Sequence, residues 1–371
     1  MLQFLKNSLI VIGHAVCAIM VLFCIIKSDE LLKDEVLVTV ATPAPGQVTL
    51  TPMLTPTKSP IETLTPTETL SPTLTSTPTI LPTATISPTP TPSPIPILTP
   101  SPTPSPTPTE QELRNQVKET VLEKISNGEY AKLDGTRNSW WFRRKKNQVP
   151  SGSGEKFKIV EYDGYYRNEN VAEEDKVIYI TIDCGYGSSN TPVMLDIFKK
   201  HDVKVTFFVT GFFVDANPEY LNRMLEEGHM VGNHSVSHAD MTKLTEQEVY
   251  DEIIGCEDAF YEATGQQINM FFRLPGGAYS KKVMQMIEDL GYQTMFWSIA
   301  YNDYDKDNQP TVEWILEHFE TYHHNGALVL MHNDSDGNRD AMDQVLTYLK
   351  EQGYRFGTLN EFGQDDMAEN Q

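Results

Sequence analysis

The chain has 371 residues, a formal net charge of −22 and only four cysteines. A nucleic-acid surface or a polybasic membrane patch needs clustered Lys and Arg, so this charge argues against both. Four cysteines are too few for a disulfide framework, and two of them, Cys17 and Cys24, fall in an apolar N-terminal run. We therefore expect no nucleic-acid partner, and the sequence predicts no protein partner.

Residues 1–28 are predicted to be a membrane anchor or a signal sequence. Residues 8–26 are apolar and uncharged, and at about 1.5 Å per residue they are long enough to cross a bilayer core. No small-residue cleavage site precedes the acidic pair Asp29 and Glu30, which favours a retained anchor over a cleaved signal peptide. In both cases the remaining chain is expected outside the cytoplasm, at the cell membrane or secreted.

Residues 29–109 are predicted to be a solvated, disordered linker. Nineteen of the 24 prolines lie between residues 42 and 109, in Thr-Pro and Ser-Pro repeats with almost no aromatic or charged residues. Such a segment cannot bury apolar surface, and as polyproline II it could extend on the order of 200 Å at about 3.1 Å per residue. The C-terminal part of the chain is therefore expected to hold one globular domain.

Residues 110–174 are predicted to form a helix and an extension of the main domain. Apolar residues recur at helical spacing over residues 110–127, which indicates one amphipathic helix with a docking or oligomerising role. Further along, Trp140, Trp141 and Phe142 precede a basic run. Their aromatic rings could stack on sugar rings or cap the end of a barrel.

Residues 175–363 alternate short apolar runs with amphipathic helical patterns, and residues 364–371 form an acidic tail. Thr245 and Glu248 have the spacing of a helix capping box. Short connections between alternating strands and helices indicate a parallel sheet, and periodicity alone does not decide between a barrel and an open doubly wound sheet. The seven expected strands lie within residues 177–183, 205–211, 230–235, 270–275, 293–299, 327–332 and 354–359.

The polar residues suited to chemistry lie at or just beyond the ends of these expected strands. In a β/α barrel the carboxyl ends of the strands meet on one face, where active sites form. We therefore expect a single active site there. Its members are Asp183, His234, His238, Arg273, Asp303 and His332.

The spacing of His234 and His238 indicates a metal site. Residues four apart lie on one side of a helical turn, an arrangement that suits Zn²⁺ or a similar ion. With Asp183 and one further ligand, the two imidazoles would leave a coordination position open for water. His323 and His324 lack this spacing, and we interpret them as solvated or helix-capping.

Asp183 follows a buried apolar strand, so its carboxylate is expected at the mouth of the core, where it needs a partner. Arg273 is the natural partner, and it would hold the carboxylate ionised, as a general base requires. His332 ends another strand on the same face and could protonate a leaving amine. Asp303 could orient its imidazole.

Five motifs resemble, in order, those of the polysaccharide deacetylase family, which is carbohydrate esterase family 4 with its NodB-homology domain. The resemblance covers about residues 175–363 and implies an α/β fold, a distorted (β/α)7 barrel. It is greatest to the branch of delta-lactam-biosynthetic de-N-acetylases that act on muramic acid, and with that branch it extends to about Ser139. The motifs are TIDCGY (181–186), HSVSH (234–238), RLPGG (273–277), NDY (302–304) and LVLMH (328–332).

This resemblance implies a role for each matching residue. Asp183 resembles the catalytic base, Arg273 the arginine that orients it, and His332 the general acid. Asp303 corresponds to the acid that tunes this histidine. His234 resembles a metal-ligating histidine of the family, and the same holds for its partner in HSVSH.

The resemblance also implies residues that contact the substrate. The backbone N–H of Gly276 falls where the family contacts the oxyanion, and Leu330 would line the acetyl pocket. Tyr304 stands where a tryptophan is common, which alters the expected shape of the sugar site.

Cys184 departs from the family pattern, because it occupies the position of the second aspartate, a metal ligand. A thiolate can ligate zinc, so a site of Cys184 with two histidines is chemically reasonable. A spectator role is the alternative, and a disulfide with Cys256 is disfavoured because Cys256 falls inside an expected helix. The expected cofactor is a divalent metal, zinc by its ligand chemistry.

The predicted activity is hydrolysis of an N-acetyl group on a peptidoglycan amino sugar, with muramic acid favoured over glucosamine. A deacetylase of N-acetylglucosamine or chitin-like chains and an O-acetyl esterase are alternatives of the same class. From another class, Cys184 motivates an inactive barrel that binds wall glycan. The presence of Asp183, Arg273 and His332 together argues against that alternative, because binding alone needs no base and no acid.

Overall fold

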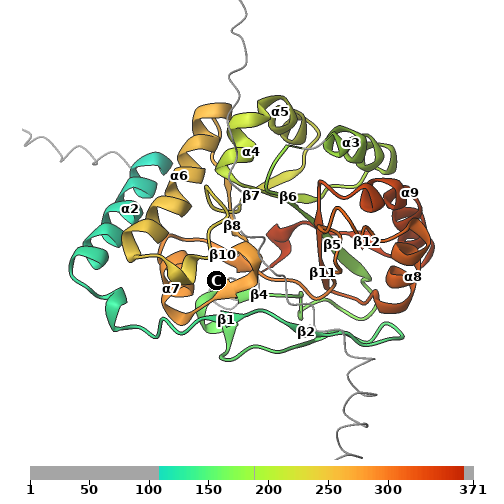
Figure 1. Ribbon diagram of the computed structural model, residues 1–371, viewed down its shortest axis with the longest axis horizontal. Coiled ribbons are helices and arrows are strands. Elements are labelled where there is room, and N and C mark those ends of the chain that lie inside the picture. The colour runs from blue at the N-terminus through green and yellow to red at the C-terminus, as the bar shows by residue number, and fades with distance from the viewer. Residues whose placement is uncertain (1–107, 188, 363–371) are drawn as a thin grey trace, which may run out of the picture. The chain divides into compact units, whose positions relative to one another are not determined.

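The computed structural model describes residues 108–187 and 189–362, and its principal element is a curled sheet surrounded by helices (Figure 1). The sheet has eight strands, and every pairing within it is parallel. The strands are β4 (Gly164–Tyr165), β5 (Val177–Cys184), β6 (Thr206–Val209), β7 (Met230–Asn233), β8 (Asn269–Phe272), β10 (Gln293–Met295), β11 (Ala327–His332) and β12 (Arg355–Phe356).

The strand order is β11-β5-β6-β7-β8-β10-β4, with β12 paired to β5. Each of the seven expected strands overlaps an observed strand, and β4 is an eighth that was not expected. The segment after β10 returns to β11 through a parallel bridge between Ile299 and Val329. The sheet therefore curls round toward its own edge, as expected of a (β/α) barrel and unlike an open doubly wound sheet.

The central strand β5 is buried along its whole length. Ile178, Ile180 and Ile182 belong to the large hydrophobic core that includes the helices, whereas Tyr179 belongs to a smaller cluster within the curled sheet. Alternate residues of a strand face opposite sides, so Asp183 shares the inner side with Tyr179. An apolar strand buried on both sides thus ends by presenting a carboxylate at the inner face.

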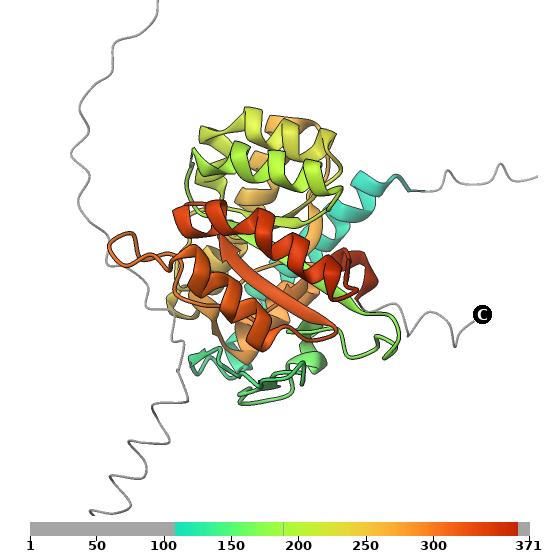
Figure 2. The ribbon, with the colours of Figure 1, turned by 90° about the vertical axis from the view of Figure 1, so that its right-hand side faces the viewer.

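Helices lie on the outer side of the sheet, and Figure 2 shows two of them, α8 and α9, beside each other. The capping box expected at Thr245 and Glu248 is confirmed at the start of α6, and Gly265 ends that helix with a φ of +68°. The helices are α3 (Asn190–His201), α4 (Gly211–Ala216), α5 (Pro218–Glu226), α6 (Glu246–Thr264), α7 (Lys281–Asp289), α8 (Val312–Tyr322) and α9 (Asp336–Glu351).

The helix expected after the linker is confirmed as α2 (Glu110–Ser126), and it docks on α6 and α7. Arg114 donates from Nε to Glu257 of α6 at 2.9 Å, and its guanidinium also reaches the backbone carbonyl of Leu290. The side chain of Glu257 is only 3% exposed, so this ion pair is largely removed from water. The docking role is therefore observed.

The aromatic cluster of the extension closes one part of the barrel. Trp140 is buried, stacks on Phe296 with ring centroids 4.4 Å apart, and donates from Nε1 to the carbonyl of Trp297 at 3.0 Å. Trp140 is therefore a core residue and is not free to stack on a sugar ring. Short antiparallel pairs hold the extension in place: β1 (Asn138–Ser139) with β9 (Ala278–Tyr279), and β2 (Phe142–Arg143) with β3 (Gly152–Ser153).

The adjacent histidines after α8 differ from expectation, because both are buried. His323 is the C-cap residue of α8, and its Nδ1 lies 2.7 Å from the carbonyl oxygen of Phe319. Capping is therefore confirmed for His323. The solvated interpretation is wrong for both residues. The rings of Tyr348, on α9, and Tyr354 pack against His323, a contact that spacing alone does not reveal.

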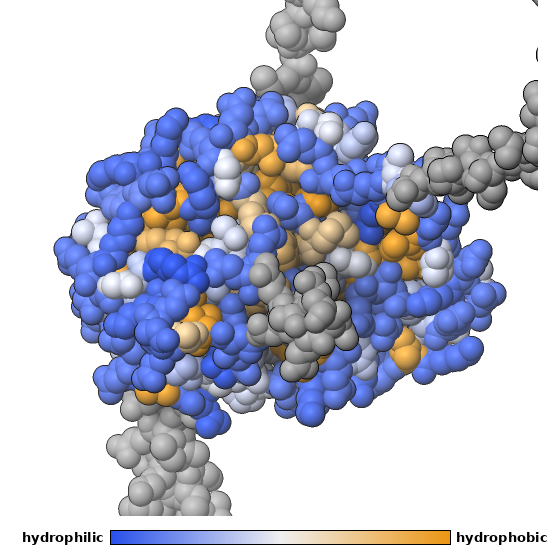
Figure 3. All heavy atoms as spheres, turned by 180° about the vertical axis from the view of Figure 1, so that it is seen from behind, coloured by the Kyte–Doolittle hydropathy of each residue, from blue (hydrophilic) through white to orange (hydrophobic). Residues whose placement is uncertain are grey.

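The predicted anchor (1–28) and tail (364–371) lie outside the described residues, and so does nearly all of the linker. Among the residues that the structure describes, no helix has the length and apolar character needed to cross a membrane. On the face turned away from the viewer of Figure 1, hydrophilic residues predominate and hydrophobic residues reach the surface nearer the middle (Figure 3).

Candidate active site

The structure gathers the predicted strand-end residues at the carboxyl ends of the parallel strands. Asp183 and His332 are direct partners in the register between β5 and β11. His234 follows β7 immediately and Arg273 follows β8, while Asp303 lies in the loop beyond β10. Because all these strands run in the same direction, their last residues converge on one face.

Asp183 is 4% exposed and lies between a cation and an imidazole. Its Oδ1 is 3.6 Å from Nη1 of Arg273, and its Oδ2 is 3.5 Å from Nε2 of His234. Burial raises the pKa of Asp183 above its ordinary value, and the opposing charge of Arg273 only partly offsets this effect. The charge of Arg273 favours the ionised carboxylate, as expected, and burial opposes it.

Arg273 is fully buried and held in a fixed position. Its Nη2 donates to Oγ1 of Thr181 at 2.8 Å, and its guanidinium carbon lies 4.5 Å from the ring centroid of Phe208. The backbone N–H of Arg273 also donates to the carbonyl of Asn233. These contacts aim a rigid cation at the carboxylate of Asp183.

His332 is held by Asp303 through both its ring and its backbone. Nδ1 of His332 lies 2.7 Å from Oδ1 of Asp303, and the backbone N–H donates to Oδ2 at 2.8 Å. Burial by itself would lower the pKa of His332, but the charge of Asp303 and its hydrogen bond outweigh burial and raise this pKa to about 9. The imidazole is therefore protonated at neutral pH, as a general acid must be.

Two residues that the sequence did not single out complete this network. Asn338, in the first turn of α9, donates from Nδ2 to Oδ2 of Asp303 at 2.6 Å. Its Oδ1 accepts from the hydroxyl of Tyr301 at 2.7 Å, which fixes the orientation of the amide. A sequence signal that could have located Asn338 is Ser335, three residues before it. Ser335 is the N-cap of α9, and its side chain accepts a hydrogen bond from the backbone N–H of Asn338.

The two histidines of the HSVSH motif come together, although not on a helical turn. Their ring centroids are 4.8 Å apart. The segment is irregular, and Ser235 and His238 both adopt left-handed backbone angles, with φ of +67° and +61°. The expected helical turn is therefore wrong, and the proximity of the rings arises from loop geometry.

Both imidazoles are neutral donors of electron pairs, as metal binding requires. Burial lowers the pKa of His234 and that of His238 to about 3. Nδ1 of His234 lies 2.8 Å from the carbonyl of Arg273, so this nitrogen carries the hydrogen and Nε2 presents its lone pair toward Asp183. Nε2 of His234 and Oδ2 of Asp183, 3.5 Å apart, are therefore electron-pair donors of the kind that a divalent cation binds, although the described side chains are not drawn together into a three-ligand site.

Cys184 does not join this group. Its thiol is fully buried on the side of β5 that faces the helices, with Sγ 3.9 Å from the carbonyl of Ile182. Burial raises the pKa of the thiol well above its ordinary value, which disfavours a thiolate. In the described parts of the chain no three His, Cys, Asp or Glu side chains are arranged as a metal site, and Cys184 and Cys256 are both free thiols.

The three predicted substrate-contacting residues also lie at this face. Gly276 follows Arg273 in a tight turn with a φ of +59°, a backbone angle that favours glycine. Leu330 precedes His332 by two residues on β11 and is paired with Thr181, so it shares the inner side of the sheet. The ring centroid of Tyr304 lies 5.8 Å from that of His332.

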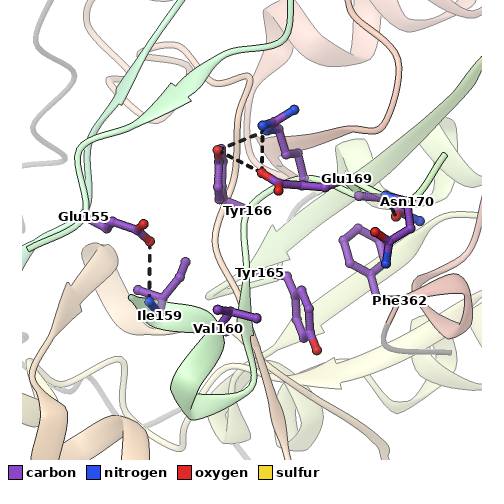
Figure 4. A pocket seen from close by; sticks show the side chains of 11 residues that line it. Glu155, Ile159, Val160, Tyr165, Tyr166, Glu169, Asn170 and Phe362 are labelled. Atoms are coloured by element: carbon purple, nitrogen blue, oxygen red, sulfur yellow. Dashed lines mark hydrogen bonds and ion pairs between the residues drawn. The ribbon is translucent and has the colours of Figure 1, made fainter. Parts of the chain in front are cut away.

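A separate cavity of about 230 Å³ contains none of these residues (Figure 4). It lies at the extension, where Tyr165 and Phe362 meet with ring centroids 5.8 Å apart. Tyr165 is the last residue of β4 and is paired with Met295, the last residue of β10. Its lining residues are Glu155, Ile159, Val160, Gly164, Tyr165, Tyr166, Arg167, Asn168, Glu169, Asn170 and Phe362.

A buried carboxylate beside an arginine, opposite an imidazole held by a second carboxylate, is an arrangement suited to hydrolysis with a separate base and acid. The family model for polysaccharide deacetylase matches residues 170–295. Peptidoglycan-N-acetylmuramic acid deacetylase PdaA of Bacillus subtilis is 39% identical over 225 residues, which cover 60% of this chain and 84% of that protein. The chain belongs to the polysaccharide deacetylase family, carbohydrate esterase family 4, and hydrolyses N-acetyl amide bonds.

Two further similarities support this assignment. The solved structure of Bacillus subtilis PdaA, a family 4 carbohydrate esterase, is 38% identical with a TM-score of 0.59, covering 64% of this chain and 99% of that one. A peptidoglycan-N-acetylglucosamine deacetylase of Bacillus cereus is 34% identical over 207 residues, covering 55% of this chain and 95% of that protein. Enzymes of this family generally depend on a metal ion.

Proposed function

We propose that this chain removes the acetyl group from an amino sugar of peptidoglycan, with N-acetylmuramic acid as the preferred substrate. The observation that carries the proposal is the pairing of Asp183 with His332 across adjacent strands, one poised as a base and the other as an acid. The similarity to a muramic acid deacetylase over 84% of that protein supports the choice of sugar.

In the first step, Asp183 takes a proton from a water molecule, and the water oxygen forms a bond to the acetyl carbonyl carbon. The carbonyl π electrons move to its oxygen, where the backbone N–H of Gly276 would donate a hydrogen bond. Arg273 holds the Asp183 carboxylate in place. Because burial raises the pKa of Asp183, this group accepts a proton more readily than an exposed aspartate would.

In the second step, the oxyanion collapses, the C–N bond breaks, and the departing amine takes a proton from His332. Nδ1 of His332 is engaged by Asp303, so the proton comes from Nε2. The products are acetate and the free amine of the sugar. Leu330 would contact the acetyl methyl group, and Tyr304, beside His332, would contact the sugar.

We further propose that His234 and His238 hold a divalent metal, with Zn²⁺ best suited to neutral imidazole ligands. Such an ion would supply Lewis-acid polarisation of the acetyl carbonyl. Cys184 is not required for this role, because its thiol is buried on the helix-facing side of β5.

We also propose that the enzyme works outside the cytoplasm, tethered by its N-terminal segment, with cell-wall glycan as its substrate. The apolar run at 8–26 and the proline-rich linker support this location. Fractionation of cells with an antibody against the C-terminal domain tests it. Recovery in the cytosol would contradict the proposal.

Incubation of the full-length protein with purified muropeptides, followed by mass spectrometry, tests the substrate. Loss of acetyl from muramic acid supports the proposal, whereas loss from glucosamine supports the alternative that the Bacillus cereus relative motivates. Asp183→Asn is the control and should lose the activity. A wild-type protein that binds glycan but releases no acetate would instead be a glycan-binding protein.

A further inference from the structure

Two large aromatic side chains stand exposed at the carboxyl ends of neighbouring strands. Tyr186 follows β5 and is 68% exposed, and Phe212 follows β6 and is 46% exposed. Their rings are almost parallel, with an interplanar angle of 19° and centroids 6.5 Å apart. Side by side they form an apolar surface, called here the aromatic platform, which no described side chain covers enough to bury.

The backbone of Tyr186 is fastened to the strands that carry the proposed base and acid. Nδ2 of Asn333 donates to the carbonyl of Tyr186 at 3.1 Å, and the backbone N–H of Asn333 donates to the carbonyl of Asp183 at 3.2 Å. Asn333 directly follows His332. Tyr186 is therefore positioned by the same strand ends that position Asp183 and His332.

Phe212 is fastened to the loop that carries the two histidines. Its backbone N–H donates to the carbonyl of Val236 at 3.4 Å, and that of Gly211 donates to Ser235 at 3.0 Å. Thr210, the N-cap of α4, also donates from Oγ1 to the carbonyl of Gly185, next to Tyr186. The platform therefore continues directly from the site along the same face.

Neither ring is needed for the core. The neighbour of Phe212 on α4, Phe213, is fully buried and provides the packing of that turn together with Val214. Tyr186 is held by its backbone carbonyl. An apolar surface that the fold does not use, beside a site for a polymer, is best explained by contact with the polymer.

We propose that the Tyr186–Phe212 platform binds a sugar ring of the glycan strand outside the disaccharide that contains the deacetylated sugar. One face of a pyranose presents C–H groups, which pack on aromatic rings, and its hydroxyl groups stay in water or reach the Tyr186 hydroxyl. This inference rests on the proposed function for the identity of the polymer. It makes the enzyme selective for strands longer than the reacting unit.

The experiment compares two substrates with the full-length enzyme: peptidoglycan strands of several disaccharides, freed of peptides, and the single disaccharide. The Tyr186→Ala, Phe212→Ala double variant should raise KM for the long strands about tenfold, which corresponds to about 1.4 kcal/mol lost from the two rings together. Its kcat, and its KM for the disaccharide, should stay within about twofold of wild type. Tyr261, on α6, is also an exposed aromatic residue, at 49%. The matched control is therefore Tyr261→Ala, which should leave KM unchanged for both substrates.

A second measurement separates this inference from the proposed function. In an Asp183→Asn background, sedimentation with insoluble peptidoglycan reports binding without turnover, and the double variant should bind more weakly than its parent. The proposal would be overturned if the double variant bound peptidoglycan as well as its parent and kept the wild-type KM for long strands. An equal rise in KM for both substrates would also overturn it, because the rings would then contact the reacting disaccharide and not a more distant sugar. Absence of turnover in wild type, with binding that depends on the platform, would reject only the proposed chemistry.

Discussion

The carboxylate of Asp303 contacts His332 at two points. Its Oδ1 lies 2.7 Å from the ring Nδ1, and its Oδ2 accepts a hydrogen bond from the backbone N–H at 2.8 Å. This two-point contact fixes the rotation of the imidazole relative to β11. It leaves only Nε2 to face the substrate. The same contact keeps the imidazole charged, so one residue determines both the orientation and the protonation of the proposed acid.

The first prediction concerns pH. If His332 donates its proton to the amine, kcat/KM should fall as pH rises through about 9, where the imidazole loses that proton. Asp303→Asn removes the negative charge that raises this pKa, so the alkaline limb should move down toward pH 6.5. The measurement is the pH profile of kcat/KM for both proteins. An alkaline limb that stays in place would remove His332 from the role of acid.

The second prediction concerns Asn338 as a positioning residue. Asn338→Ala removes a hydrogen bond to a carboxylate, worth about 1.5–3 kcal/mol, so kcat should fall roughly ten- to a hundredfold. Tyr301→Phe leaves the amide in place but frees its rotation, so a smaller fall is expected. The readout is kcat together with the alkaline limb of the pH profile. A variant with both unchanged would mean that Asn338 serves only the start of α9.

The third prediction concerns the metal ligands. Elemental analysis of purified protein should find less bound divalent metal in His234→Ala and in His238→Ala than in wild type. Cys184→Ala should retain the wild-type content, because the thiol is buried and its pKa is raised. Loss of metal from the Cys184 variant alone would instead establish the thiol as a ligand.

The fourth prediction concerns the docking of α2. Arg114→Met breaks an ion pair whose side chains are 10% and 3% exposed. Because Lys118 and the Tyr292 hydroxyl still contact Glu257, the expected loss is that of a hydrogen bond to a charged group, about 1.5–3 kcal/mol. Thermal unfolding should therefore begin at a lower temperature. As the control, Asp196→Ala removes the exposed partner of Arg223 and should change stability by less than about 1 kcal/mol. If Arg114→Met and Asp196→Ala unfold at the same temperature, the docking of α2 through Arg114 contributes little to stability.

Two errors of sequence reasoning have the same physical origin. The i, i+4 spacing of HSVSH suggested a helix, but left-handed angles at Ser235 and His238 form a loop that brings the rings together by another route. Likewise, His323 and His324 are polar and adjacent, yet both are buried. Local spacing carries no information about which neighbouring segments pack over a loop.

The sequence by itself determined seven of the eight strands of the parallel sheet and the residues at their ends, and it missed only β4, which is two residues long. Continuous apolar runs such as that of β5 remain strands in any packed arrangement, and Asp183 and His332 follow such runs directly. Only the tertiary structure decided how these groups behave. Burial outweighs Arg273 at Asp183, Asn338 reaches Asp303 from a distant helix, and Cys184 faces the helices. These outcomes depend on distance and desolvation between segments far apart in the chain, which local sequence does not encode.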